Sequence, residues 1–199
     1  QLKDLPGLLT GDHFNAAIIA NTTPDDDQFL NRAHLPFPVV LINRAIPRYS
    51  CVVEDPEAGG RAGGMLLSGK RRALAVLRGN PLTQTTQDRT NSFIKTVSGQ
   101  LGRPPQEIVA ESLSEKAAYD AMTRFLEKGG KIDGLYAVTD GLALGAYQAI
   151  KGRGLEIPGD VAVVGVGDYD ISNFFDPPLS VAGVERRELG REASRLLLR

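Results

Sequence analysis

One segment of the chain, residues 134–170, constrains the fold more than any other because its order of elements can be read directly. The apolar run 135–138 predicts a strand, and the apolar residues that follow recur at the three- and four-residue spacing of a helix. Gly152 and Gly154 predict the end of that helix, and the β-branched run 161–166 predicts a second strand. A strand, a helix and a strand in this order form a βαβ unit, whose two strands lie parallel in one sheet.

The rest of the chain alternates in the same way. Residues 78–88 are predicted to be a loop, and further elements are predicted on both sides of it. The other strands are expected at 16–20, 39–42, 51–53, 73–77, 108–110 and 180–184, and the other helices from about 24 and at 56–67, 89–101, 114–127 and 188–198. This alternation predicts a parallel, doubly wound α/β fold. In such sheets ligands bind at the carboxyl ends of the strands.

Composition narrows the classes of function and partner. The 199 residues carry 23 basic and 24 acidic side chains, so no broad basic surface for nucleic acid is implied. The apolar runs are strand-sized, so no membrane partner is expected. Cys51, the single cysteine, fits a reducing compartment, and beside only His13 and His34 it predicts no zinc site. The acidic run 25–27 lies in a predicted first helical turn, where carboxylates favour the helix dipole, and is not expected to bind metal.

The sequence contains no complete motif of a known enzyme class. Gly165-Val166-Gly167 resembles the start of a dinucleotide fingerprint, but Asp170 stands where the third glycine belongs. The glycine-rich run 59–64 lies inside a predicted helix and contains no Gly-Lys-Ser/Thr. No Gly-x-Ser-x-Gly elbow occurs, and neither histidine has a recognisable catalytic partner. We therefore expect no catalytic residue and no cofactor, although an α/β enzyme is not excluded.

The segment 138–170, with the sequence VTDGLALGAYQAIKGRGLEIPGDVAVVGVGDYD, resembles the hallmark segment of effector domains in the lactose and galactose repressor (LacI/GalR) family. Other segments fit the same family in the right order, and together they cover nearly the whole chain. These are FPVVLINR (37–44), VEDPEAGGRAG (53–63), LLSGKRRALAVL (66–77), Gly79-Asn80-Pro81 followed by DRTNSF (88–93), DPPLS (176–180) and Glu188-Leu189-Gly190.

The resemblance implies a periplasmic-binding-protein-like fold of type I, with two doubly wound parallel-sheet lobes and a ligand cleft between them. The N-lobe is expected at 1–79 plus 185–199, and the C-lobe at 80–184. In this family a small molecule in the cleft changes how two subunits of a homodimer sit together. Operator DNA is read by a separate N-terminal helix-turn-helix headpiece, which these residues do not contain.

The resemblance also implies that part of the N-lobe is missing. Leu2, Leu5, Leu8 and Leu9 resemble the remnant of its second helix, and the family's first βαβ stretch is absent. We therefore expect residues 1–199 to belong to a longer protein. Cooperative melting of a well-folded monomer of these residues would contradict that expectation.

Arg89 matches a family arginine that hydrogen-bonds ligand hydroxyls or carboxylates. A guanidinium suits this role because it presents several donors in a fixed geometry, although a solvated arginine remains the alternative. Thr139 and Gly167 stand where relatives commonly carry Asn and Asp, and Val184 stands where they carry a ligand-facing Gln. Asp168 either substitutes for the missing carboxylate or caps the following turn.

Several polar residues have a plainer interpretation beside the functional one. Asp140 and Asp55 precede helices, where capping is the simpler role. Thr22 and Asn43 follow N-lobe strands, like Asn21, and serve either the cleft or a turn. Tyr136 is expected in the core or the cleft wall. The ligand-binding candidates are Arg89, Thr139, Asp168, Gly167, Asn80 and Asn21.

These departures from the family pattern bear on the ligand. A sugar pocket needs many directional hydrogen bonds, because each buried polar group left unpaired costs about 1–3 kcal/mol. The effector is therefore expected to be less polyhydroxylated, or to be a sugar read by different residues. The leading function is the effector-binding and dimerisation domain of a cytoplasmic transcriptional regulator. The alternative is the solute-binding protein of a sugar ABC transporter, which shares the fold.

Overall fold

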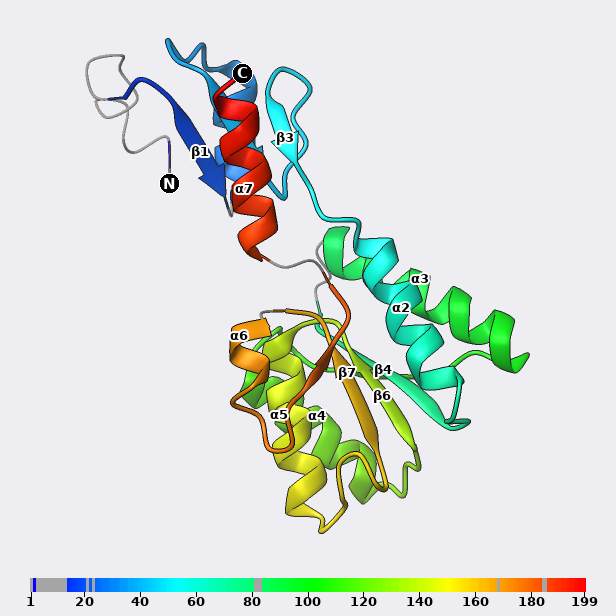
Figure 1. Cartoon of the computed structure of the whole chain (residues 1–199). Coiled ribbons are helices and arrows are strands. Elements are labelled where there is room, and N and C mark those ends of the chain that lie inside the picture. Colours follow the sequence, from blue (N-terminus) through cyan, green and yellow to red (C-terminus); the bar gives the residue numbers. More distant parts are fainter. Residues whose placement is uncertain are drawn as a thin grey trace. The chain divides into compact units, whose positions relative to one another are not determined.

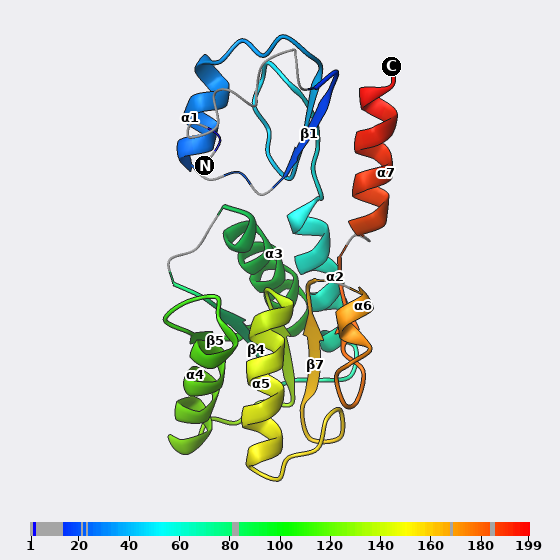
Figure 2. The ribbon, with the colours of Figure 1, turned by 90° about the vertical axis from the view of Figure 1, so that its left-hand side faces the viewer.

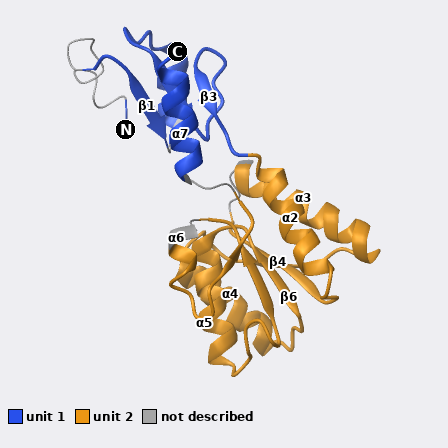
Figure 3. Cartoon of the chain, in the orientation of Figure 1, with its two compact units in different colours: residues 1–54, 184–199 blue, residues 55–183 orange. Residues whose placement is uncertain are grey.

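The computed structural model describes residues 2, 14–20, 22, 24–80, 84–167, 169–183 and 186–199 (Figure 1). The chain forms two compact units, each with its own parallel sheet. Unit 1 consists of residues 1–54 and 184–199, and unit 2 of residues 55–183 (Figure 3). The α/β class with parallel sheets agrees with the fold expected from the sequence.

Unit 1 contains a three-stranded parallel sheet between two helices. The strands are β1 (Ala17–Ala20), β2 (Val39–Ile42) and β3 (Ser50–Val52), in the order β1-β2-β3. Helix α1 (Pro24–Arg32) covers one face and α7 (Arg186–Leu197) the other (Figure 2). Leu30 of α1 and Leu41 of β2 are fully buried in one cluster, and α7 buries Leu189 and Ala193. The acidic residues 25–27 occupy the first turn of α1, as expected.

Unit 2 contains a five-stranded parallel sheet with two long helices on each face. Its strands, in the order β5-β4-β6-β7-β8, are β4 (Leu74–Arg78), β5 (Gln106–Val109), β6 (Gly134–Ala137), β7 (Ala162–Gly165) and β8 (Ser180–Val181). Its helices are α2 (Pro56–Ser68), α3 (Gln84–Leu101), α4 (Glu115–Glu127), α5 (Asp140–Gly152) and the short α6 (Tyr169–Ser172). Helices α2 and α3 lie on one face of the sheet and α4 and α5 on the other (Figure 1). Among the described residues, no helix is long and apolar enough to cross a membrane.

The core of unit 2 centres on β6, all four residues of which are buried. Tyr136 is fully buried and stacks on Phe93 of α3, with ring centroids 4.6 Å apart. A Cβ on Gly63 of α2 would lie 2.5 Å from the Tyr136 ring, so only glycine lets α2 approach the ring this closely. Tyr136 is therefore a core residue, and the glycine-rich run 59–64 serves packing.

The boundary between the units differs from the expected one. The sequence placed residues 55–79 in the N-lobe, but the structure places them in unit 2. The reason lies in sheet pairing, because β4 lies between β5 and β6 and is part of the larger sheet. The crossing from unit 1 therefore follows β3, just before α2.

Two predicted elements also need correction. The predicted loop 78–88 is shorter, because α3 begins at Gln84 and not at Arg89. The first turns of α3 bury the polar residues Thr86 and Thr90, so no apolar periodicity in the sequence marks the start of the helix. The buried Thr90 hydroxyl is satisfied inside the helix, because its Oγ1 donates to the Thr86 carbonyl at 2.7 Å. Helix α6 was not predicted, since four residues are too few to show helical periodicity.

Several residues named from the sequence lie outside the described part of the chain. These are Leu5, Leu8, Leu9, His13, Asn21, Pro81, Asp168 and Val184. Leu2 is described, and its backbone N–H donates to Asp26 Oδ1 at 2.7 Å.

Candidate functional site

The candidate site in unit 2 lies along the carboxyl edge of its sheet. Strands β4, β6 and β7 are neighbours and parallel, with Leu77 opposite Ala137 and Tyr136 opposite Val164. Their carboxyl ends therefore meet at one edge, the edge that binds ligands in open α/β sheets.

Arg89 reaches this edge from α3. Its Nη1 donates to the carbonyl oxygen of Val138, directly after β6, at 3.0 Å. The helix is held close by Gly60 of α2, where a Cβ would lie 2.4 Å from the Arg89 carbonyl oxygen. Arg89 is thus half-buried and tied to the end of a strand, rather than being a solvated residue at a helix start.

Thr139 is the N-cap of α5. Its Oγ1 accepts a hydrogen bond from the Leu142 backbone N–H at 3.2 Å. The capping role that the sequence gave to Asp140 therefore belongs to Thr139. Asp140 is the first helical residue, and its Oδ1 accepts from the Gly141 N–H at 2.9 Å.

Gly167 lies against the carboxyl group of Asp140. A Cβ on Gly167 would lie 2.5 Å from Asp140 Oδ2 and 2.6 Å from Asp140 Cγ, closer than real Cβ atoms approach other atoms. Asp140 therefore occupies the space that a side chain at position 167 would need. Position 167 lacks the aspartate that relatives commonly carry, but the carboxylate of Asp140, which follows the neighbouring strand β6, lies beside it.

The structure thus brings together three of the six ligand-binding candidates, Arg89, Thr139 and Gly167. Asn80 lies exposed beyond the end of β4, and the other two candidates, Asn21 and Asp168, lie outside the described residues.

Asp140 is the residue that sequence reasoning undervalued. The order of the strands carries the signal for Asp140. Strands β6 and β7 are adjacent and parallel, residues 139–140 come just after β6, and residue 167 comes just after β7. A glycine on one strand end beside an aspartate on the next suggests that one side chain replaces the other. The spacing becomes informative only once the strand order is known.

Other candidates serve local structure. Asp55 is the N-cap of α2, as expected, and accepts from the Ala58 N–H at 3.1 Å. That hydrogen bond, with a contribution from Arg61, lowers the pKa of Asp55. In unit 1, Asn43 has a positive φ of 56°, and its Oδ1 accepts from the Glu54 N–H at 3.1 Å, which is turn chemistry.

Thr22 of unit 1 is engaged in a polar network. Its Oγ1 donates to Asp27 Oδ1 at 2.8 Å and accepts from Arg44 Nε at 3.0 Å. Arg44 also lies 3.4 Å from the Asp27 carboxylate. These groups satisfy one another around the start of α1.

Comparison with known proteins places the chain in a family. The family of periplasmic binding protein-like domains matches residues 64–199, more than half of the chain. The ribose operon repressor of Bacillus subtilis is 28% identical over 187 residues, which cover 94% of this chain and 56% of the repressor. The chain spans about half the length of the curated relatives it matches.

Solved structures of LacI-family regulators have the same fold as this chain. A LacI family transcription regulator from Clostridium acetobutylicum superposes with a TM-score of 0.84 at 27% identity, covering 98% of this chain and 74% of that one. A LacI family regulator from Enterococcus faecium, solved with bound ribose, has a TM-score of 0.77 at 22% identity, covering 92% and 70%. The second likeness bears on the fold alone. The chain therefore belongs to the family of periplasmic binding protein-like domains, in the form that LacI-family transcriptional regulators carry.

Proposed function

We propose that the chain is the effector-binding and dimerisation part of a LacI-type transcriptional regulator, with a sugar or a related metabolite as effector. The observation that carries the proposal is the Arg89 guanidinium, tied to the Val138 carbonyl at the carboxyl edge of unit 2. Thr139 and Asp140 follow Val138 directly. A guanidinium supplies donors and a carboxylate supplies acceptors, and sugar hydroxyls need both.

Of the two effector classes open from the sequence, the structure favours a sugar read by different residues. Gly167 removes a carboxylate, but Asp140 brings one to the same place. The carboxyl edge of the sheet therefore keeps a carboxylate that can accept hydrogen bonds, at position 140 instead of position 167. The similarity to the ribose operon repressor of Bacillus subtilis supports a pentose as the first ligand to examine.

Calorimetric titration of the full-length protein with ribose and other sugars tests this proposal. We expect a sugar to bind, and Arg89→Gln to weaken its binding at least tenfold because charge-assisted hydrogen bonds are lost. Arg124→Gln, an exposed cation of α4, is the control and should leave the affinity unchanged. Wild-type affinity in Arg89→Gln would overturn the assignment of the site.

Dimerisation is proposed to use an apolar surface of unit 2. Helices α4 and α5 pack closely, since a Cβ on Gly145 would lie 2.1 Å from the Glu115 carbonyl oxygen. The turn after α6 packs on α5, because the ring of Phe175 meets the ring of Tyr147 edge to face, with centroids 4.9 Å apart. These elements and the turn after α6 expose four large apolar side chains: Tyr119 (40% exposed), Leu144 (37%), Ile171 (46%) and Phe174 (89%).

Sedimentation of variants tests the dimer. Leu144→Asp and Phe174→Asp should convert the dimer to monomer, because each places a charge in an apolar interface. Leu66→Asp, at an exposed position of α2, is the matched control and should remain dimeric. A wild-type protein that is monomeric at micromolar concentration would refute this part of the proposal.

Operator binding and a cytoplasmic location are proposed for the whole protein, on the strength of its repressor relatives. The full-length protein is expected to bind operator DNA and to change its affinity when the effector is added. A full-length protein that binds sugar but no DNA would instead favour the solute-binding alternative.

A further inference from the structure

The hydroxyl of Ser92 links α3, the helix that carries Arg89, to the start of α2. Ser92 is buried and lies about one helical turn after Arg89. Its Oγ donates to the carbonyl of Glu57, in the first turn of α2, at 2.7 Å. We infer that Ser92 is a positioning residue, which holds Arg89 in place for an effector at the carboxyl edge of unit 2. This role rests on the proposed effector site, and Ser92 acts through Arg89 rather than by touching the effector.

Helices α2 and α3 pack closely at the same turn of α3. A Cβ on Gly60 of α2 would lie 2.4 Å from the Arg89 carbonyl oxygen and 2.9 Å from both Phe93 N and Ser92 Cβ. A glycine surface by itself gives little preference for one register of the two helices over another. A hydrogen bond gives a strong one, because it weakens steeply when its angle departs from linear. The Ser92 hydroxyl therefore fixes the register at the turn that begins with Arg89.

The first turns of α2 also meet the other side of the candidate site. A Cβ on Gly59 would lie in ordinary contact, 3.9 Å from Cγ2 of Val166, the residue before Gly167. The first turns of α2 therefore contact both the Arg89 turn of α3 and the strand end that lies against Asp140. The hydrogen bond from α3 thereby links the position of the guanidinium to that of the carboxylate, the two groups proposed to bind the effector.

The contact of Arg89 with the sheet depends on where α3 lies. Its Nη1 donates to the Val138 carbonyl at 3.0 Å, and a shift of α3 would lengthen or bend this bond. Phe93, next to Ser92, stacks on Tyr136 and keeps α3 against β6. Stacked rings tolerate a range of offsets, however, so the stack does not fix α3 along the sheet. The directional contact at this turn comes from the Ser92 hydroxyl.

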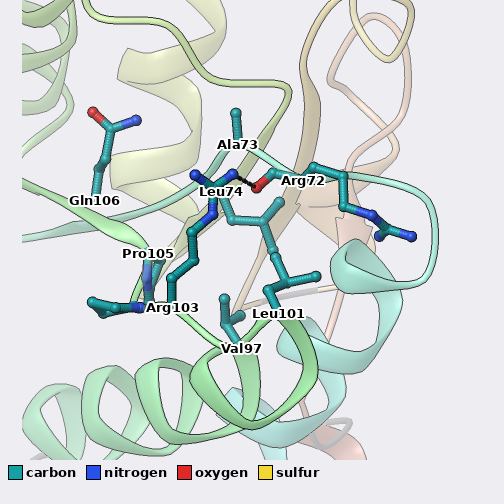
Figure 4. A pocket seen from close by; sticks show the side chains of 9 residues that line it. Arg72, Ala73, Leu74, Val97, Leu101, Arg103, Pro105 and Gln106 are labelled. Carbon is teal, nitrogen blue, oxygen red and sulfur yellow. Dashed lines mark hydrogen bonds between the residues drawn. The ribbon is translucent and has the colours of Figure 1, made fainter.

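A second hydrogen bond fastens the other end of α3 and provides a matched control. Arg103 lies just beyond the end of α3, and its Nη2 donates to the Arg72 carbonyl at 2.9 Å, the bond drawn in Figure 4. Both bonds tie the helix to the backbone of a neighbouring segment, but only the Ser92 bond lies at the Arg89 turn. Loss of the Arg103 bond should therefore loosen the far end of α3 without moving Arg89.

The position of the guanidinium can be tested in the absence of ligand, by the Arg89 Nε–Hε signal in the nuclear magnetic resonance spectrum of the full-length protein. Loss of the signal in Arg89→Gln assigns it. Ser92→Ala should shift or broaden this signal, because the Arg89 turn is no longer fixed. Asn91→Ala, at an exposed position nearer in sequence, and Arg103→Ala should leave it unchanged. A wild-type signal in Ser92→Ala would overturn the inference.

Calorimetric titration of the same proteins with ribose tests the consequence for binding. Ser92→Ala should weaken binding about two- to tenfold, the range set by the net contribution of one hydrogen bond, and Arg103→Ala should not. In the Arg89→Gln background, Ser92→Ala should cause no further loss, because a residue that acts only through Arg89 has nothing left to position. Additive losses, or wild-type affinity in Ser92→Ala, would contradict the positioning role.

Failure of the proposed function gives a different result. If ribose does not bind the wild type, the effector assignment loses its support, while the ligand-free signal still decides whether Ser92 positions Arg89. If ribose binds and Arg89→Gln loses affinity while Ser92→Ala matches the wild type, the effector site stands and the role of Ser92 is wrong.

Discussion

Gly167 and Asp140 show how a side chain after one strand can exclude a side chain after the neighbouring strand. The two residues follow adjacent strands, and the carboxyl group of Asp140 fills the space beside the glycine. A side chain at 167 and an aspartate at 140 exclude each other in this backbone.

The first prediction concerns that exclusion. Gly167→Ala should lower the free energy of unfolding by about 1–3 kcal/mol, because the new methyl group overpacks against Asp140. The measurement is urea denaturation. Gly183→Ala, where the nearest atom would lie 3.4 Å away, is the control and should change little. If Asp140→Gly fails to relieve the cost of Gly167→Ala in the double variant, the proposed exclusion is wrong.

Thr139 offers a second prediction, because it caps α5 at the candidate site. Thr139→Ala should lower the free energy of unfolding by about 1 kcal/mol, whereas Thr139→Ser should keep nearly all of it, since serine also accepts from the Leu142 N–H. Thermal melting measures both. Equal stability of the alanine variant and the wild type would contradict the capping role.

Tyr147 leads to a prediction about alkaline pH. Burial raises the pKa of Tyr147 from 10.0 to about 12, and its ring meets Phe175 edge to face at 4.9 Å. Between those two pH values the unfolded chain ionises the phenol and the folded protein holds it neutral, so the free energy of unfolding falls as the pH rises. Two pH units correspond to roughly 2–3 kcal/mol.

The free energy of unfolding, measured by denaturation at pH 9 and pH 11.5, is compared between the wild type and Tyr147→Phe. This variant keeps the aromatic ring and removes the ionising hydroxyl. The variant should lose less stability over this interval than the wild type does. Tyr119→Phe, at an exposed position, should follow the wild type. An identical fall in Tyr147→Phe would show that this tyrosine is not responsible.

Helix α2 shows what a run of glycines does for packing between elements. Gly60 and Gly64 face α3, with Cβ positions 2.9 Å or less from Phe93 N and Thr96 Cβ respectively, while Gly63 faces the Tyr136 ring. The helix therefore buries backbone where other helices bury side chains. The same close approach sets the position of α3, and with it Arg89.

The fourth prediction tests this packing. Gly63→Ala should lower the free energy of unfolding by about 1–3 kcal/mol, because its Cβ would lie 2.5 Å from the Tyr136 ring. Gly99→Ala, in α3 with no atom within 4 Å, should instead stabilise the protein by about 0.5–1 kcal/mol through helix propensity. Should both variants gain stability in urea denaturation, close packing at Gly63 would be refuted.

The two units differ in how the chain builds them. Unit 2 is one continuous segment, with a five-stranded sheet and the larger apolar core, whereas unit 1 combines two distant segments around three strands. A continuous segment with its own core meets the requirements of an independently folding domain.

We therefore expect a fragment of residues 55–183 to fold alone. Its circular dichroism should show a cooperative thermal transition, and its amides in β4, β6 and β7 should be protected from hydrogen exchange. In the whole chain, unit 1 should exchange faster than unit 2 because its core is smaller. A fragment that melts without cooperativity would show that unit 2 depends on unit 1.

The sequence by itself determined the alternation of strands and helices, the parallel sheets and the family, because these depend on local periodicity and on motif order. It also identified the cap at Asp55 and the dipole role of residues 25–27, which are local interactions. Where local signals were weak, as at the polar start of α3 and in the four-residue α6, the elements were missed.

Only the tertiary structure decided which residues meet. Strand β4 belongs to the larger sheet, so the boundary between the units lies after residue 54 and not after residue 79 as expected. The pairing partners of a strand are set by the whole sheet and not by its neighbours in sequence. The contact of Gly167 with Asp140, the bond from Arg89 to the Val138 carbonyl and the bond from Arg103 to the Arg72 carbonyl all join residues 27 or more positions apart. Such contacts depend on packing in three dimensions, which no local pattern encodes.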